Sequence, residues 1–130
     1  MTTRALVLDE PLSLWGGLDP ATGEIIDVHH PQRGARVTRR VLVMPAGRGS
    51  SSSASVLAEA ARVATAPAAI VLREPDLILA IGAAVAEELY DVRIPVLVVD
   101  EATYSGIVDG EPFEVPAFDA SGRPPAADRG

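Results

Sequence analysis

The chain has 130 residues, of which 48% are hydrophobic and only 4% aromatic. This length suits a single domain, whose core must be built from Val, Leu, Ile and Ala. The formal net charge is −7; a general nucleic-acid binder needs a basic face, so we expect no nucleic-acid partner. The chain has no cysteine, so it forms no disulfide and offers no thiolate to zinc or to an iron–sulfur cluster.

The sequence shows no segment that would send the protein to or through a membrane. Its first 30 residues lack a basic stretch followed by an apolar one, as a signal peptide has. No apolar run reaches the roughly 18 residues that a membrane-spanning helix requires. We therefore expect a cytoplasmic protein with no membrane partner.

The amino-terminal part is predicted to be a strand followed by a long loop. Residues 5–8 form an apolar run that ends in two acids and a proline. Residues 12–34 contain several Gly and Asp-Pro turn signals, with a short strand expected at 24–27. The only tryptophan, Trp15, is interpreted as a core or interface anchor.

From residue 37 to 99, strands and helices are predicted to alternate. Residues 41–44 are continuously apolar, as in a strand buried on both faces. Helical spacing follows between residues 53 and 64, then a second buried strand at 68–74, a helix at 77–90 and a third buried strand at 94–101. This order predicts an α/β domain with a central, partly parallel sheet flanked by helices.

The carboxyl-terminal segment is expected to add β structure and then lose order. Asp109-Gly110 is a hairpin turn signal, so a short turn and a hairpin are predicted between residues 102 and 118. Residues 119–130 are polar and rich in Pro and Gly, which predicts a disordered tail.

The stretch MPAGRGSSSSAS, residues 44–55, is the strongest candidate for a functional loop. A flexible tether is the simplest interpretation of Gly and Ser, but both flanks are predicted to be structured. Ligand-binding loops of α/β proteins lie at the carboxyl ends of strands, and a helix N-terminus attracts anions. A serine among residues 50–53 could also cap the helix that follows. We interpret the stretch as a site for a small carboxylate or phosphate, with a serine close enough to react.

The common nucleotide and hydrolase motifs do not fit this stretch. A P-loop requires a lysine after its last glycine, and this chain contains no lysine. The Rossmann pattern keeps Gly47 and Gly49 but has Ser52 at its third position, and G-x-S-x-G is absent.

Other titratable residues are weaker candidates. His29 and His30 are the only histidines, and adjacent residues of an extended chain point to opposite sides, so a loop pair is favoured over a metal site. Asp9 and Glu10 fit solvated or capping roles. No metal-ligating set and no general base stand out, so catalysis would need a partner. Two classes remain open: an enzyme subunit with an anion-binding serine loop, or a non-catalytic ligand-binding or interaction module.

Four ordered stretches resemble the small subunit of the aconitase X family. They are residues 6–34 (LVLDEPLSLWGGLDPATGEIIDVHHPQRG), 41–60 (VLVMPAGRGSSSSASVLAEA), 66–90 (APAAIVLREPDLILAIGAAVAEELY) and 94–101 (IPVLVVDE). The resemblance implies that residues 1–118 form a swivelling domain, a mobile β/β/α unit that closes over an active site.

The same resemblance implies a hydro-lyase, that is, a dehydratase active only with its large subunit. The large subunit would carry an iron centre or iron–sulfur cluster, and this chain would bind no metal. Ser50, which follows the loop glycine, would be the base that removes a proton from the substrate. The substrate carboxylate would be held by Gly47, Arg48, Gly49, Ser51 and Ser52. Aconitase itself has an arginine where this chain has Ser52, so which arginine grips the substrate is open.

Two small hydroxy-acid substrates follow from the resemblance. Bacterial-looking members are similar to cis-3-hydroxy-L-proline dehydratases, and archaeal members resemble mevalonate 5-phosphate dehydratases. The Arg-only, Ala-rich composition is typical of a high-GC bacterium. The loop reads GSSSS, whereas archaeal members more often have Thr-Val-Gly after the first serine. Both features favour hydroxyproline, with mevalonate 5-phosphate as the alternative.

Overall fold

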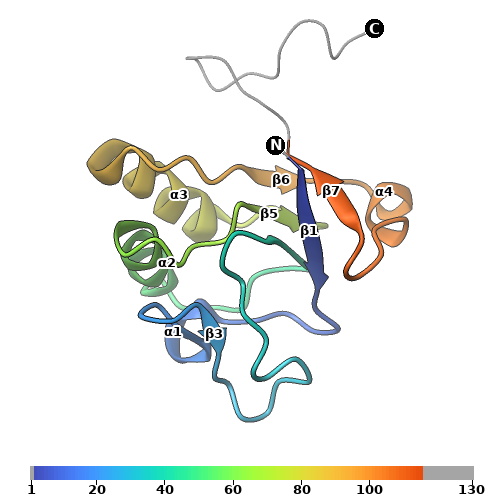
Figure 1. Ribbon diagram of the computed structural model, residues 1–130, viewed down its shortest axis with the longest axis horizontal. Helices are drawn as coiled ribbons and strands as arrows, with labels where there is room; N and C mark the ends of the chain where they lie inside the picture. The colour runs from blue at the N-terminus through green and yellow to red at the C-terminus, as the bar shows by residue number, and fades with distance from the viewer. Residues whose placement is uncertain (1, 116–130) are drawn as a thin grey trace, which may run out of the picture.

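The computed structural model describes residues 2–115 (Figure 1). The predicted tail at 119–130 lies outside the described residues, as does the end of the predicted 1–118 domain. The elements in chain order are β1 (Thr2–Val7), α1 (Leu14–Gly17), β2 (Leu18–Asp19), β3 (Glu24–Ile25), β4 (Val41–Met44), α2 (Ser53–Arg62), β5 (Ala69–Leu72), α3 (Leu77–Tyr90), β6 (Val96–Val98), α4 (Glu101–Ser105) and β7 (Pro112–Glu114). Within this range, no helix is long and apolar enough to cross a membrane.

Five strands form the central sheet in the order β6-β5-β4-β1-β7. Strands β1, β4, β5 and β6 are parallel, and β7 runs antiparallel to β1. Strands β2 and β3 form a separate two-stranded hairpin. The carboxyl ends of the four parallel strands therefore meet at one edge of the sheet, where α/β proteins bind ligands. The α/β fold class predicted from the sequence is confirmed.

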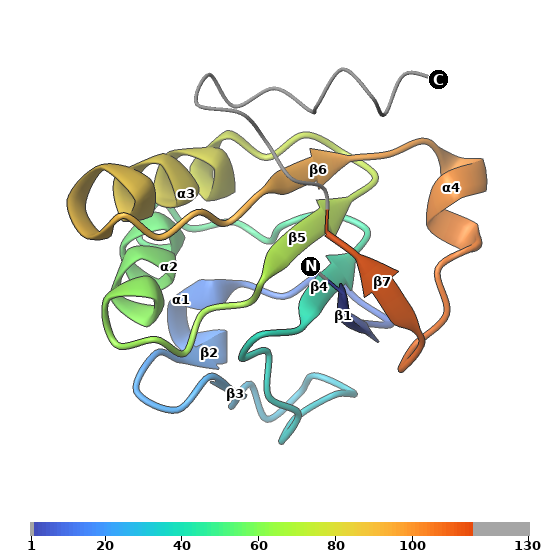
Figure 2. The same cartoon turned by 45° about the horizontal axis from the view of Figure 1, so that its top comes forward.

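Apolar side chains are buried on both faces of the sheet. All four residues of β4 and all four of β5 are buried, as their continuous apolar runs predict. One face packs against α2, α3 and the α1–β3 region, whereas the other packs against residues around α4 and β7. Figures 1 and 2 show this division: α1, α2 and α3 gather on one side of the molecule, and α4 and β7 lie on the other.

Two predictions from the sequence are wrong. The segment before Asp109-Gly110 is the short helix α4 and not a hairpin strand, and β7 after the turn pairs with the free edge of β1. The third strand, β6, is an edge strand and only partly buried, so Val98 is exposed. For Trp15, 59% of whose surface is exposed, the core role is excluded and the interface role stays a prediction.

Candidate functional site

The Gly/Ser stretch, here called the serine loop (residues 45–52), lies where the sequence predicts it. It joins the carboxyl end of β4, the central strand, to the start of α2. A parallel bridge between Leu12 and Gly47 ties it to the segment after β1. The backbone N–H of Arg73, just after β5, donates a hydrogen bond to the Pro45 carbonyl over 3.1 Å. The loop is thus held between the segments that follow both neighbouring strands.

Ser50 is half-buried in this loop, and its hydroxyl already accepts a backbone hydrogen bond. The Ser52 N–H donates to Ser50 Oγ over 3.2 Å, and the Ser53 N–H donates to the Ser50 carbonyl over 3.0 Å. An N–H donor stabilises an oxygen that carries negative charge, and the following ten-residue helix adds its dipole. The geometry at Ser50 Oγ therefore favours an anionic oxygen more than an isolated serine would.

The neighbouring backbone leaves donors free for an anion. Within residues 2–115, the N–H groups of Gly49, Ser50 and Ser51 have no hydrogen-bond acceptor. Arg48 is exposed and, among the same residues, makes no ion pair or side-chain hydrogen bond. Consecutive free amides and an unpaired guanidinium can bind a carboxylate or phosphate.

The serine at the N-terminus of α2 does not cap the helix with its side chain, as the sequence suggested it could. Ser52 is the N-cap residue of α2, but its side chain makes no capping hydrogen bond. Ser53 is buried, and its Oγ accepts a hydrogen bond from the backbone N–H of Trp15 over 3.2 Å. Ser53, the first residue of α2, therefore ties this helix to the α1 turn. The hydroxyls of Ser51 and Ser52 make no capping hydrogen bond to α2.

The structure explains why position 47 is a glycine, which the sequence pattern alone did not. A Cβ at this position would lie 2.0 Å from Oδ2 of Asp76, so only glycine fits without movement. Asp76 is the N-cap of α3, and its Oδ1 accepts the Leu79 N–H over 2.9 Å. The start of α3 thus packs directly against the serine loop, and Asp76 belongs to the site.

The hollow at the serine loop is small. Its lining residues come from the segment after β1, the serine loop and the starts of α2 and α3: Leu12, Leu14, Gly47, Arg48, Gly49, Ser50, Ser53, Asp76, Ile78 and Leu79. Its volume of about 10 Å³ holds roughly one water molecule. The hollow by itself is therefore too small to enclose an organic substrate.

Arg73 is the other cation near this edge, but it is already engaged. Its Nη1 lies 2.9 Å from Oε2 of Glu101, and its guanidinium carbon lies 5.0 Å from the centre of the Tyr104 ring. Two side-chain hydrogen bonds lower the pKa of Glu101; the larger effect comes from Arg73 and the smaller from Ser105. Burial raises the pKa of Tyr104. Arg48 is consequently the better candidate to hold a substrate anion.

The histidine pair does not form a metal site. His29 is exposed, whereas His30 is buried in its loop. The Gln32 N–H donates to His30 Nδ1 over 3.0 Å, so Nε2 of the neutral ring carries the proton and donates to the Glu10 carbonyl at 3.1 Å. Both ring nitrogens are thus used in holding the loop. Asp9 and Glu10 are exposed, as a solvated role predicts.

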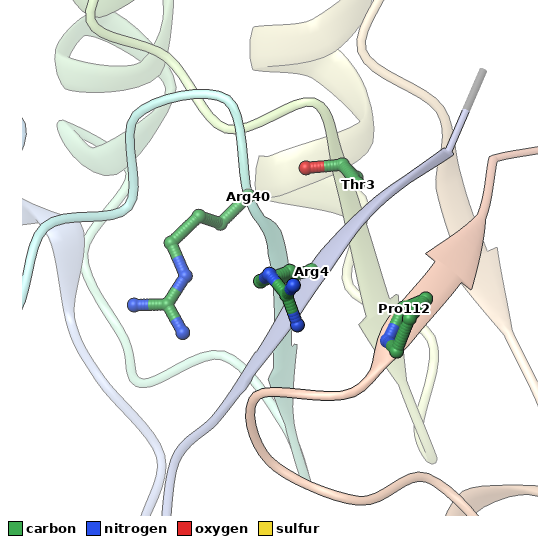
Figure 3. Close-up of a pocket in the computed structure, with 4 residues that line it drawn as sticks. All are labelled: Thr3, Arg4, Arg40 and Pro112. Atoms are coloured by element: carbon green, nitrogen blue, oxygen red, sulfur yellow. The ribbon is translucent and has the colours of Figure 1, made fainter.

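A larger hollow of about 400 Å³ lies at the opposite ends of the parallel strands, lined by Thr3, Arg4, Arg40 and Pro112 (Figure 3). Its two guanidinium groups are held by backbone carbonyls: Arg4 donates to Gly110 over 2.9 Å and Arg40 to Ala5 over 3.2 Å. No carboxylate or imidazole lines it. The serine loop is therefore the better candidate for a reaction.

The fold and this loop define a small α/β domain whose carboxyl edge presents free backbone amides and an exposed arginine, and comparison with known proteins gives its family. The family model described as the aconitase X swivel domain matches residues 1–120. The chain belongs to this family, as the resemblance in the sequence implies.

Relatives of two kinds are found. A cis-3-hydroxy-L-proline dehydratase of Pseudomonas aeruginosa is 52% identical over 90 residues, which are 69% of this chain and 16% of that protein. A phosphomevalonate dehydratase small subunit of Methanopyrus kandleri is 49% identical over 79 residues, 61% of this chain and 58% of that protein. The chain thus spans less than two thirds of either relative.

A solved structure shares the fold. The chain superposes on Thermococcus kodakaraensis aconitase X (holo-form) with a TM-score of 0.73 and 30% identity, covering 86% of this chain and 79% of that one. At this identity the likeness supports the family as well as the fold.

Proposed function

We propose that this chain is the swivel-domain subunit of an aconitase X-type dehydratase and acts with a large subunit that completes the active site. The family match and the relatives named as dehydratases support this proposal. The observation that supports it most directly is the geometry at Ser50. Its Oγ accepts a hydrogen bond from the Ser52 N–H just before α2, and the neighbouring amides of residues 49–51 are free within residues 2–115. That arrangement suits a serine that must hold negative charge beside a bound anion.

In the proposed mechanism, Ser50 acts as the base. Its alkoxide accepts the proton from the carbon next to the substrate carboxylate, and the hydroxyl group leaves the neighbouring carbon as hydroxide while the carbon–carbon double bond forms. The proton on Ser50 and the hydroxide together make up the released water, which returns Ser50 to its alkoxide. The Ser52 N–H stabilises the alkoxide before the transfer. The substrate carboxylate lies on the amides of Gly49 and Ser51 and against Arg48, with the hydroxyls of Ser51 and Ser52 close by.

The iron centre expected for this kind of enzyme does not fit the residues of this chain. The sequence has no cysteine, and among the described residues no group of three or more His, Asp and Glu side chains could hold a metal ion. We therefore assign the iron or iron–sulfur cluster to the large subunit, where it would serve as the Lewis acid for the leaving hydroxyl.

We propose cis-3-hydroxy-L-proline as the substrate. The Pseudomonas relative with that name and the GSSSS loop support it. Mevalonate 5-phosphate is the second candidate, because the Methanopyrus relative is nearly as similar. A carboxylate occurs in both substrates, so the amides of the serine loop suit either.

The test is to co-express the chain anaerobically with the large subunit from the same organism and to assay water loss from both substrates. Ser50→Ala should retain folding and assembly but lower turnover by about 10²–10⁴-fold, the usual contribution of a general base. Ser105→Ala, an exposed serine in α4 on the other side of the molecule (Figure 2), is the matched control and should keep full activity. Full activity of Ser50→Ala would exclude the base assignment, and a stable complex inactive on both substrates would exclude both substrate assignments.

A further inference from the structure

Helix α3 presents a row of large apolar side chains to solvent. Leu77, Ile81, Val85 and Leu89 follow each other at four-residue spacing, which places them along one side of the helix. Leu77 is 75% exposed, Ile81 47% and Leu89 64%. Only Leu79, Gly82 and Ala86 of this helix are buried. An exposed apolar surface of this length marks an interaction site more often than a solvated face.

The row borders a hollow between α3 and α2. This hollow has a volume of about 420 Å³, and its lining residues are Ala54, Ser55, Ala58, Glu59, Ile81, Val85, Leu89 and Tyr90. The side formed by α2 is made mostly of small residues, so the hollow can admit apolar side chains of another surface. Its only carboxylate, Glu59, is already paired with Arg62 at 2.8 Å. The chemistry of this surface therefore selects an apolar partner surface.

The apolar row begins at the serine loop. Leu77 directly follows Asp76, and Ile78 lines the serine hollow together with Ser50. Trp15 follows Leu14, which also lines that hollow, and the backbone N–H of Trp15 is fixed to Ser53 Oγ. Large exposed apolar residues of α1 and α3 are thus direct sequence neighbours of residues that line the hollow. Figure 2 shows α1, α2 and α3 on the same side of the molecule.

We propose that Trp15, Leu77, Ile81, Val85, Leu89 and Tyr90, here called the apolar strip, form the docking surface for the large subunit. The inference rests on the proposed function. The serine hollow is too small to enclose a substrate, and the described residues contain no cluster of three or more His, Asp or Glu side chains that could hold a metal ion. The large subunit must therefore reach the edge of the loop, which is where the strip starts. Residues 2–115 of a second copy would bring to the loop no cluster of three or more side chains that could hold a metal ion.

The test compares two double variants in the co-expressed complex. Leu77→Arg with Leu89→Arg alters the strip at exposed positions, so folding should be retained. Val28→Arg with Val108→Arg alters equally exposed apolar residues elsewhere, which are 63% and 56% exposed. Folding is checked by circular dichroism, and affinity for the large subunit is measured by titration calorimetry. We expect the strip variant to bind about tenfold more weakly or worse, and the control to stay within about twofold of the parent chain.

The outcomes separate this inference from the proposed function. If the parent chain forms an active complex and the folded strip variant binds as tightly as the control, the docking surface is wrong and the proposed function stands. If the parent chain binds no large subunit and has no activity with it, both are wrong. If the chain alone forms a dimer in analytical ultracentrifugation, and the strip variant is monomeric, the strip is a self-association surface and the proposed occupant is wrong.

Discussion

Replacing Ser53 by alanine should destabilise the domain by about 1–2 kcal/mol. Ser53 is 4% exposed, and its Oγ accepts the Trp15 N–H over 3.2 Å. A hydrogen bond of this kind contributes about 0.5–1.5 kcal/mol net, and a donor left without a partner away from water costs about 1–3 kcal/mol. Because Trp15 is largely exposed, water can reach part of this turn after the substitution. The expected value therefore lies toward the lower part of that range.

Equilibrium unfolding in urea measures the effect, with Ser55→Ala as the matched control. Ser55 is exposed and lies in the same helical turn, so both variants gain the same helix propensity, about 0.5 kcal/mol. The difference between the two midpoints then reports the bond to Trp15. In thermal unfolding, Ser53→Ala should melt about 4–8 °C below the control. Equal unfolding midpoints for the two variants would refute the role given to this hydrogen bond.

Two further effects follow from the structure. Gly47→Ala should cost about 1–3 kcal/mol by urea unfolding, since its Cβ would lie 2.0 Å from Oδ2 of Asp76, whereas Gly49→Ala meets no atom within 4 Å and should leave stability unchanged; equal losses would contradict this. At the start of α4, an amide hydrogen bond lowers the pKa of Asp100 and the bond from an arginine lowers that of Glu101. Their stabilising contribution is therefore present above about pH 4–5 and lost as the pH falls through the folded-state pKa values. Amide hydrogen exchange should show α4 opening before α3 on acidification, and simultaneous opening would exclude the assignment.

The buried strands could be predicted because their signal is local. Continuous apolar runs at residues 41–44 and 69–72 require burial on both faces, and the structure gives it. The pairing of β7 with β1 could not be predicted in this way, because residues 112–114 find their partner more than 100 positions away in the sequence. The turn signal at Asp109-Gly110 marked the turn correctly but does not specify which strand accepts the segment after it.

The candidate site was predictable as a loop but not as a set of contacts. The strand–Gly/Ser–helix order places residues 45–52 at the carboxyl edge, as the structure confirms. The amide bond from Ser52 to Ser50 Oγ depends on the local backbone, and the contact of Gly47 with Asp76 depends on how α3 packs. Neither contact can be predicted from the composition of the loop. The roles of these residues in binding and proton transfer remain predictions that the Ser50→Ala experiment tests.

Helix α3 shows why an apolar sequence alone does not identify the surface that covers it. LILAIGAAVAEELY is apolar on nearly every side, and such a helix is typically surrounded by protein. The sheet and α2 cover only the side that holds Leu79, Gly82 and Ala86, where Gly82 brings the two helix backbones close together. The side with Leu77 and Leu89 has no cover within the described residues. A helix apolar on both sides is consistent with one side serving the domain core and the other a partner, and the exposed side begins next to the loop that the proposed large subunit would close.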